Sequence, residues 1–119
     1  MAMTALSVLI VEDDAIIGQL LAEILEDMGH MVCAIVATED EAVADAMRHQ
    51  PGLMLVDLNL QEGDGISAVD RILKNGPKPY VLMSGAPMRA GRPSATVLRK
   101  PFSEQDLAQA IQRVVAPRS

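Results

Sequence analysis

The stretch at residues 53–60, Leu-Met-Leu-Val-Asp-Leu-Asn-Leu, constrains the fold more than any other part of this chain. Four apolar residues lead to Asp57, and a turn with two glycines follows at residues 63–65. A short apolar run without alternation is typical of a strand covered on both faces, as in a parallel sheet between helices. Ligands bind at the carboxyl edge of such sheets, so Asp57 is predicted to stand at a functional edge.

The length and the apolar pattern indicate one domain without a membrane segment. With 119 residues the chain can form a single core, and we expect residues 1–119 to be one domain. No run approaches the ~20 apolar residues that a membrane span requires. The first five residues carry no basic charge, and the apolar run that follows is too short for a signal peptide. Because Cys33 is also the single cysteine, we expect a cytoplasmic protein.

The charge balance argues against direct binding of nucleic acid. The formal net charge is −6, and the chain has one Phe, one Tyr and no Trp. Proteins that bind DNA or RNA usually present a basic surface, and those that bind single strands add stacking aromatic side chains. We therefore expect any effect on DNA to pass through a partner protein.

Strand-like apolar runs alternate with helical periodicity along the chain. Strands are predicted at residues 6–11, 31–37, 53–57, 79–83 and 95–98. A first helix is predicted from Asp14 as its N-cap to Gly29. Its expected buried face comprises Ile17, Leu20, Leu21, Ile24, Leu25 and Met28.

Three further helices are indicated by capping signals and apolar faces. Thr38 opens one that runs to about His49 with Ala42, Val43, Ala46 and Met47 inward. Another covers residues 66–73, and the last is capped near Ser103 and ends before Pro117. Between residues 85 and 93, two glycines and two prolines make a regular helix doubtful. Strands alternating with crossover helices predict a doubly wound α/β sandwich around a parallel sheet.

Polar side chains follow four of the predicted strands. They are Glu12 and Asp13, Asp57, Ser84 and Lys100. The carboxyl ends of parallel strands share one edge, so these groups are expected to converge. Neighbouring carboxylates repel one another, and a hard oxygen site of this kind suits Mg²⁺. Lysine and hydroxyl groups beside the metal would favour a phosphoryl group, with a carboxylate as its acceptor.

At these positions the sequence resembles the receiver domain of bacterial two-component response regulators. The resemblance covers nearly the whole chain and rests on four spaced motifs: Val11-Glu12-Asp13-Asp14, Asp57-Leu58-Asn59, Ser84-Gly85 and Lys100-Pro101-Phe102. It implies a flavodoxin-like five-stranded sheet of order 2-1-3-4-5 with five helices around it.

The resemblance also implies roles for individual residues. Asp57 matches the aspartate that accepts a phosphoryl group from a sensor histidine kinase or a histidine phosphotransfer protein. Asp13 matches a direct Mg²⁺ ligand, Glu12 an acid that holds metal-bound water, and Asn59 the position whose backbone carbonyl binds the metal.

Two residues of the later motifs match groups that respond to the phosphoryl group. Ser84 matches the switch hydroxyl and Lys100 the lysine that contacts the phosphate. Pro101, which follows this lysine, is expected after a cis peptide bond.

The chain departs from the family pattern on its predicted output face. Val97 stands where family members usually have Phe or Tyr, three residues before the lysine. Lys100 follows Ser84 by 16 positions, fewer than usual, which leaves a shortened or irregular fourth helix. A subgroup of receivers with Thr-Gly after the fourth strand has a similar feature. We therefore expect a divergent output face and a monomer or a weak dimer.

The leading hypothesis is a phosphorylation-controlled switch or phosphate shuttle that catalyses its own phosphorylation without being a conventional enzyme. The sequence does not identify the downstream protein partner. One alternative is a pseudo-receiver that binds partners without phosphate, which the valine and the shortened segment favour. Another is a small phosphatase or phosphotransferase with Asp57 as covalent intermediate. Against this last reading, Asn59 stands where a second acid would be needed.

Overall fold

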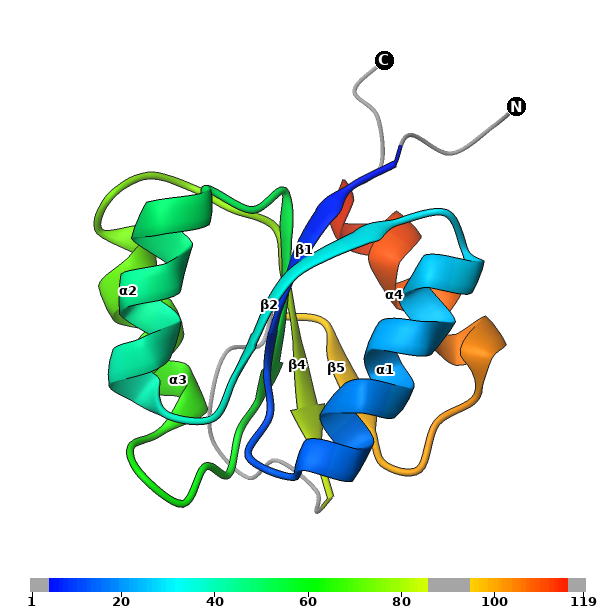
Figure 1. Cartoon of the computed structure of the whole chain (residues 1–119), viewed down its shortest axis with the longest axis horizontal. Helices are drawn as coiled ribbons and strands as arrows, with labels where there is room; N and C mark the ends of the chain where they lie inside the picture. The colour runs from blue at the N-terminus through cyan, green and yellow to red at the C-terminus, as the bar shows by residue number, and fades with distance from the viewer. Residues whose placement is uncertain (1–4, 86–94, 116–119) are drawn as a thin grey trace.

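A parallel five-stranded sheet forms the centre of the molecule (Figure 1). The structure is a computed structural model that describes residues 5–85 and 95–115. Neighbouring strands all pair in parallel, and the order across the sheet is β2-β1-β3-β4-β5, as predicted. The strands are β1 (Ser7–Val11), β2 (Met31–Val36), β3 (Leu53–Asp57), β4 (Tyr80–Ser84) and β5 (Val97–Arg99).

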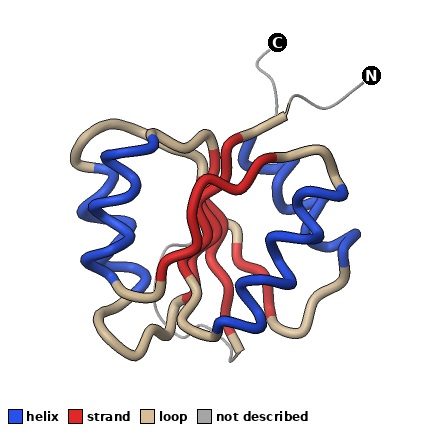
Figure 2. Tube along the Cα trace, viewed as in Figure 1, coloured by secondary structure: helices blue, strands red, loops and turns tan. Residues whose placement is uncertain are grey.

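Helices cover both faces of the sheet, which makes the α/β sandwich that the sequence predicted. Figure 2 shows the strands as a central layer with helices on each side. On one face lie α1 (Ala15–Asp27) and α4 (Glu104–Val115), and on the other lie α2 (Glu39–His49) and α3 (Gly65–Leu73). Among the described residues, no helix is long and apolar enough to cross a membrane.

Alternation within the central strands divides the core into two layers. In β1, Val8 and Ile10 pack toward α1 and α4, whereas Leu9 and Val11 pack toward α2 and α3. All four side chains are fully buried. A strand enclosed on both faces needs apolar residues at every position, which explains the continuous apolar run in the sequence.

Side-chain caps begin the helices where the sequence predicted them. Oδ1 of Asp14 accepts hydrogen bonds from the amides of Ile16 and Ile17, at 2.9 and 3.1 Å. Oγ1 of Thr38 accepts one from the amide of Glu41 at 3.1 Å. These bonds satisfy amide groups that have no partner within the helix.

The buried face of α1 differs from the prediction by a small rotation. Leu20 was expected inward but is 55% exposed, whereas Gly18 and Ala22 are buried. A Cβ at position 18 would lie only 2.9 Å from Cγ2 of Ile35 in β2. The helix therefore approaches the sheet through its small residues, which turns Leu20 outward. On α2, Met47 was also expected inward and is 50% exposed.

Two predictions concern the last part of the sheet. The fifth strand is Val97–Arg99, shorter and later than the predicted 95–98, and it pairs with the end of β4. The irregular fourth helix was predicted for the segment after Gly85, and residues 86–94 lie outside the described part of the chain.

Candidate functional site

The predicted site residues meet at the carboxyl edge of the sheet. Asp57 is the last residue of β3, Ser84 the last of β4, and Lys100 follows β5 directly. The amide of Lys100 donates a hydrogen bond to the carbonyl of Ser84 at 2.7 Å. This bond fixes the backbone of Lys100 relative to the end of β4. Glu12 and Asp13 follow β1, the strand that pairs with β3.

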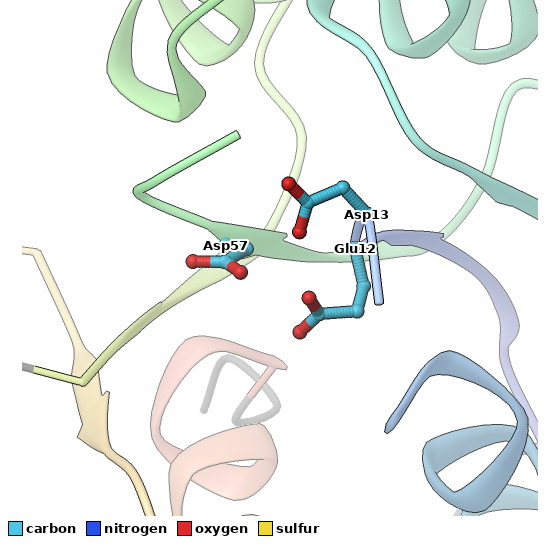
Figure 3. Close-up of side chains that lie close together, drawn as sticks. All are labelled: Glu12, Asp13 and Asp57. Carbon is cyan, nitrogen blue, oxygen red and sulfur yellow. The ribbon is translucent and has the colours of Figure 1, made fainter. Parts of the chain in front are cut away.

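Three carboxylates lie around a common space at this edge (Figure 3). Glu12, Asp13 and Asp57 each offer one oxygen, and these oxygens all lie within 4.8 Å of one another. Glu12 and Asp57 are buried, and Asp13 is half-buried. Three carboxylates this close would repel one another strongly unless a cation stood nearby.

Lys100, which follows β5 at the same edge of the sheet, supplies a positive charge. Its Nζ lies 2.8 Å from Oε1 of Glu12 and 3.1 Å from Oδ2 of Asp57. Burial alone would lower the pKa of Lys100, but its hydrogen bonds to the two carboxylates outweigh burial and raise this pKa above 10.5. The lysine therefore stays charged at neutral pH.

Glu12 has a raised pKa at this site, chiefly because its carboxyl group is buried. Burial raises the pKa of its carboxyl group above 4.5, and the bond from Lys100 offsets only part of this effect. The nearby carboxylate of Asp57 raises the pKa further. A second cation would stabilise the ionised form of Glu12.

Backbone amides orient the three carboxylates. The amide of Asn59 donates to Oδ1 of Asp57 at 3.0 Å, and the amide of Gln61 donates to Oδ2 of Asp13 at 2.8 Å. The amide of Asp14 donates to Oε2 of Glu12 at 3.2 Å. Each carboxylate thus has one oxygen held by the backbone, which limits its rotation.

These residues fit a small divalent cation. Mg²⁺ prefers oxygen ligands, and the cluster offers carboxylate oxygens from two neighbouring strand ends. A bound cation would also offset the burial that raises the pKa of Glu12.

The remaining residues of the predicted motifs lie at or near the same edge of the sheet. Ser84 is buried at the end of β4, and Asn59 is exposed two residues after Asp57. The peptide bond between Lys100 and Pro101 is cis, as expected. Val97, which replaces the usual aromatic residue, is 38% exposed on β5.

Sequence reasoning missed Gly65 and Gln61 as parts of the site. A Cβ on Gly65 would collide with the carbonyl oxygen of Asp57, so only glycine allows α3 to start this close to the end of β3. The glycine pair of the turn was a signal for this contact. Gln61 acts through its backbone amide, and a backbone contact of this kind leaves no signal in residue type.

A parallel sheet of this order, with acids after β1 and β3 and a lysine after β5, defines a receiver-type α/β domain. The chain matches the family described as "Response regulator receiver domain" over residues 8–112. It belongs to this family, which confirms the resemblance found in the sequence.

Curated relatives include regulators from two bacteria. The chain is 32% identical over 117 residues to the phyllosphere-induced regulator PhyR of Methylorubrum extorquens, covering 93% of this chain and 44% of PhyR. It is 34% identical over 117 residues to the transcriptional regulatory protein PdtaR of Mycobacterium tuberculosis, covering 92% and 56%. The chain therefore spans about half the length of these relatives.

Solved receiver domains have the same fold. The receiver domain of Erythrobacter litoralis PhyR superposes with a TM-score of 0.86 at 28% identity, covering 100% of this chain and 99% of the other. The receiver domain of a sensor histidine kinase from Pseudomonas aeruginosa superposes with a TM-score of 0.84 at 25% identity, covering 96% and 100%. In that structure a magnesium ion is coordinated in the active site cleft.

Proposed function

We propose that this chain is a phosphoacceptor receiver domain that binds Mg²⁺ and takes a phosphoryl group on Asp57. One observation carries the proposal: the buried carboxylate of Asp57 lies beside two further acids and in contact with Lys100. Family membership supports the same reading. We take the whole chain, residues 1–119, as this one domain.

The proposed reaction is a transfer of a phosphoryl group from a phosphohistidine. An oxygen of Asp57 forms a bond to phosphorus while the bond between phosphorus and the imidazole nitrogen of the donor breaks. The electron pair stays on that nitrogen, and the imidazole leaves as a neutral base because its other ring nitrogen carries a proton in the reacting phosphohistidine. Bound Mg²⁺ would neutralise charge on the phosphoryl oxygens.

The residues of this chain prepare Asp57 for that step. Glu12, Asp13, Asp57 and the backbone carbonyl of Asn59 would hold the metal. The amide of Asn59 fixes Oδ1 of Asp57, so that the carboxylate keeps one orientation. The ammonium group of Lys100 lies beside Oδ2 of Asp57, and it would stabilise the negative charge on the phosphoryl oxygens during transfer.

The phosphoryl group would then change contacts at two strand ends. It adds about two negative charges at the acceptor. Lys100 and the hydroxyl of Ser84 would turn toward it, and the two residues are already joined by a backbone hydrogen bond. Because β4 and β5 pair there, the change would reach Val97 and the groove that it lines with Phe102 and Arg113 of α4.

The donor would be a sensor histidine kinase or a histidine phosphotransfer protein. Ile16 and Leu20 lie one helical turn apart on α1, which begins beside the site, and they are 82% and 55% exposed. Exposed apolar side chains next to an acceptor suit docking of a protein donor. We expect a cytoplasmic regulator that is a monomer or a weak dimer and acts through a protein partner, not through nucleic acid or a membrane.

Titration with Mg²⁺ followed by beryllofluoride, monitored by amide NMR, tests the proposal. Resonances of residues next to Asp13 and Asp57 should shift with Mg²⁺, and those of Lys100 and β5 should shift with beryllofluoride. The Asp57→Asn variant should show no beryllofluoride response. A wild-type spectrum that neither addition changes would contradict the proposal.

An unchanged wild-type spectrum would instead favour a pseudo-receiver, which binds its partner without phosphate. Val97 on the output face is the observation behind this alternative. A pseudo-receiver would keep its partner-binding surface in one state whatever the metal or phosphate present.

A further inference from the structure

We propose that Glu39, the first residue of α2, is a positioning residue for the acceptor site. It anchors the loop at residues 58–64, which joins β3 to α3 and which we call the acceptor loop. The inference deepens the proposed function and rests on it. Glu39 would set how tightly the site binds Mg²⁺ without touching the metal.

The carboxylate of Glu39 binds groups at the end of the acceptor loop and on α3. Its Oε1 accepts a hydrogen bond from the amide of Asp64 at 2.9 Å. Its Oε2 accepts from Oγ of Ser67 at 2.7 Å and from Nη1 of Arg71 at 2.9 Å. The amide of Glu39 also donates to the carbonyl of Glu62 at 3.1 Å. One residue thus holds both the loop and the helix that follows it.

The acceptor loop packs directly against Glu39. Gly63 has φ +96°, and a Cβ at this position would collide with the Cβ of Glu39. The side chain of Glu39 is only 16% exposed, and the hydrogen bond from Arg71 lowers the pKa of its carboxyl group below 4.5. The carboxylate of Glu39 is therefore ionised at neutral pH and half-buried.

The same loop reaches the acceptor site a few residues earlier. The amide of Asn59 holds Asp57, and the amide of Gln61 holds Asp13. The loop therefore bridges Glu39 and two of the three clustered acids. Without the anchor, the loop would sample more conformations, and metal binding would have to order it.

Groups that orient metal ligands from outside typically change metal affinity by 10–100-fold when they are removed. Because Glu39 acts through the loop backbone, we expect Glu39→Gln to weaken Mg²⁺ binding by about tenfold, at the low end of that range. Amide exchange at Gln61 should become faster in the same variant. Calorimetry and hydrogen exchange measure the two effects.

The chain offers a matched control in Asp40→Asn. Asp40 binds the same guanidinium, Nη1 of Arg71, at 2.9 Å, but its side chain is 90% exposed, and its carboxylate makes no hydrogen bond to the acceptor loop among the described residues. Removing this exposed ion pair should change little. Asp40→Asn should therefore keep wild-type Mg²⁺ affinity and wild-type exchange at Gln61.

A second variant perturbs the contact from the loop side. Gly63→Ala should also weaken Mg²⁺ binding, because the added methyl group pushes the loop away from Glu39. Equal Mg²⁺ affinity in Glu39→Gln and Asp40→Asn would overturn the inference, even if Glu39→Gln lowered the stability of the fold.

Failure of the proposed function would be recognised separately. A wild-type chain that bound no Mg²⁺ would contradict that function, and exchange at Gln61 would then decide the anchoring role. Faster exchange in Glu39→Gln than in Asp40→Asn would support the anchor, and equal exchange would overturn it.

Discussion

Nζ of Lys100 lies 3.1 Å from Oδ2 of Asp57, although 43 positions separate the two residues in the chain. The same ammonium group lies 2.8 Å from Oε1 of Glu12. One lysine that follows β5 therefore balances two buried acids at the ends of β1 and β3.

Replacing Lys100 with Met should lower the stability of the metal-free fold but strengthen the binding of Mg²⁺. Without Mg²⁺, Glu12 and Asp57 would lose their shared partner, and the free energy of unfolding should fall by ~1–3 kcal/mol. This is below the usual cost of breaking a buried pair, because the lysine side chain is 22% exposed. Mg²⁺ should bind more tightly to the variant, since no ammonium group competes for the acids. Urea unfolding and calorimetry measure both effects, and weaker Mg²⁺ binding would contradict the explanation.

Replacing Gly65 with Ala should damage the fold and the acceptor together. The new Cβ would meet the carbonyl oxygen of Asp57 and the Cα of Leu58. Overpacking of this kind typically costs about 1–3 kcal/mol, and the displaced strand end should also slow phosphorylation. Gly52→Ala is the matched control, because a Cβ there meets only ordinary contacts. Comparable losses in the two variants would show that the close approach at Gly65 is unimportant.

Glu12 should make the metal-free fold less stable as pH rises. Its pKa is raised in the fold, chiefly by burial, so the folded state holds the proton more tightly than the unfolded state. Stability from this group is full below about 4.5 and is lost as pH rises through the folded pKa. The advantage of Glu12→Gln over wild type should therefore grow with pH in that window and then level off. Urea unfolding across pH, with EDTA present, measures it. A constant difference would contradict the raised pKa.

His30, at the other end of the sheet, should make the fold less stable as pH falls. Its Nδ1 accepts a hydrogen bond from the amide of Leu6 at 3.1 Å, and burial lowers its pKa below 6.5. Nε2 has no hydrogen-bond partner in the described part of the chain. The unfolded state therefore binds the proton more readily, and stability should fall as pH drops through about 6.5. His30→Gln keeps an acceptor and cannot be protonated, so its unfolding should depend less on pH in this range. An unchanged dependence would rule out His30 as its source.

The sequence pattern predicted a parallel sheet and the residues that meet at its edge, and the resemblance to receiver domains supplied the strand order. Continuous apolar runs identified β1 and β3 as enclosed strands, and parallel pairing brings their ends together whatever their separation in the chain. Since β5 belongs to the same parallel sheet, Lys100 lies at the edge that Asp13 and Asp57 share.

Other features depend on packing that residue type does not encode. Leu20 faces outward because Gly18 and Ala22 let α1 approach the sheet closely, and periodicity alone favoured the larger side chains. The anchor at Glu39 depends on the packing of α2 against α3, across 25 to 32 positions of sequence. A capping signal predicted a helix start near Thr38, and an apolar face predicted a helix after Gly65. Neither pattern predicted that the two helices share a carboxylate.

Incubation with acetyl phosphate and Mg²⁺, followed by intact-protein mass spectrometry, tests the central claim most directly. The wild type should gain the mass of one phosphoryl group, the gain should require Mg²⁺, and Asp57→Ala should show none. A wild type that gained nothing, or an Asp57→Ala variant that gained the group equally, would contradict the assignment of Asp57 as the acceptor.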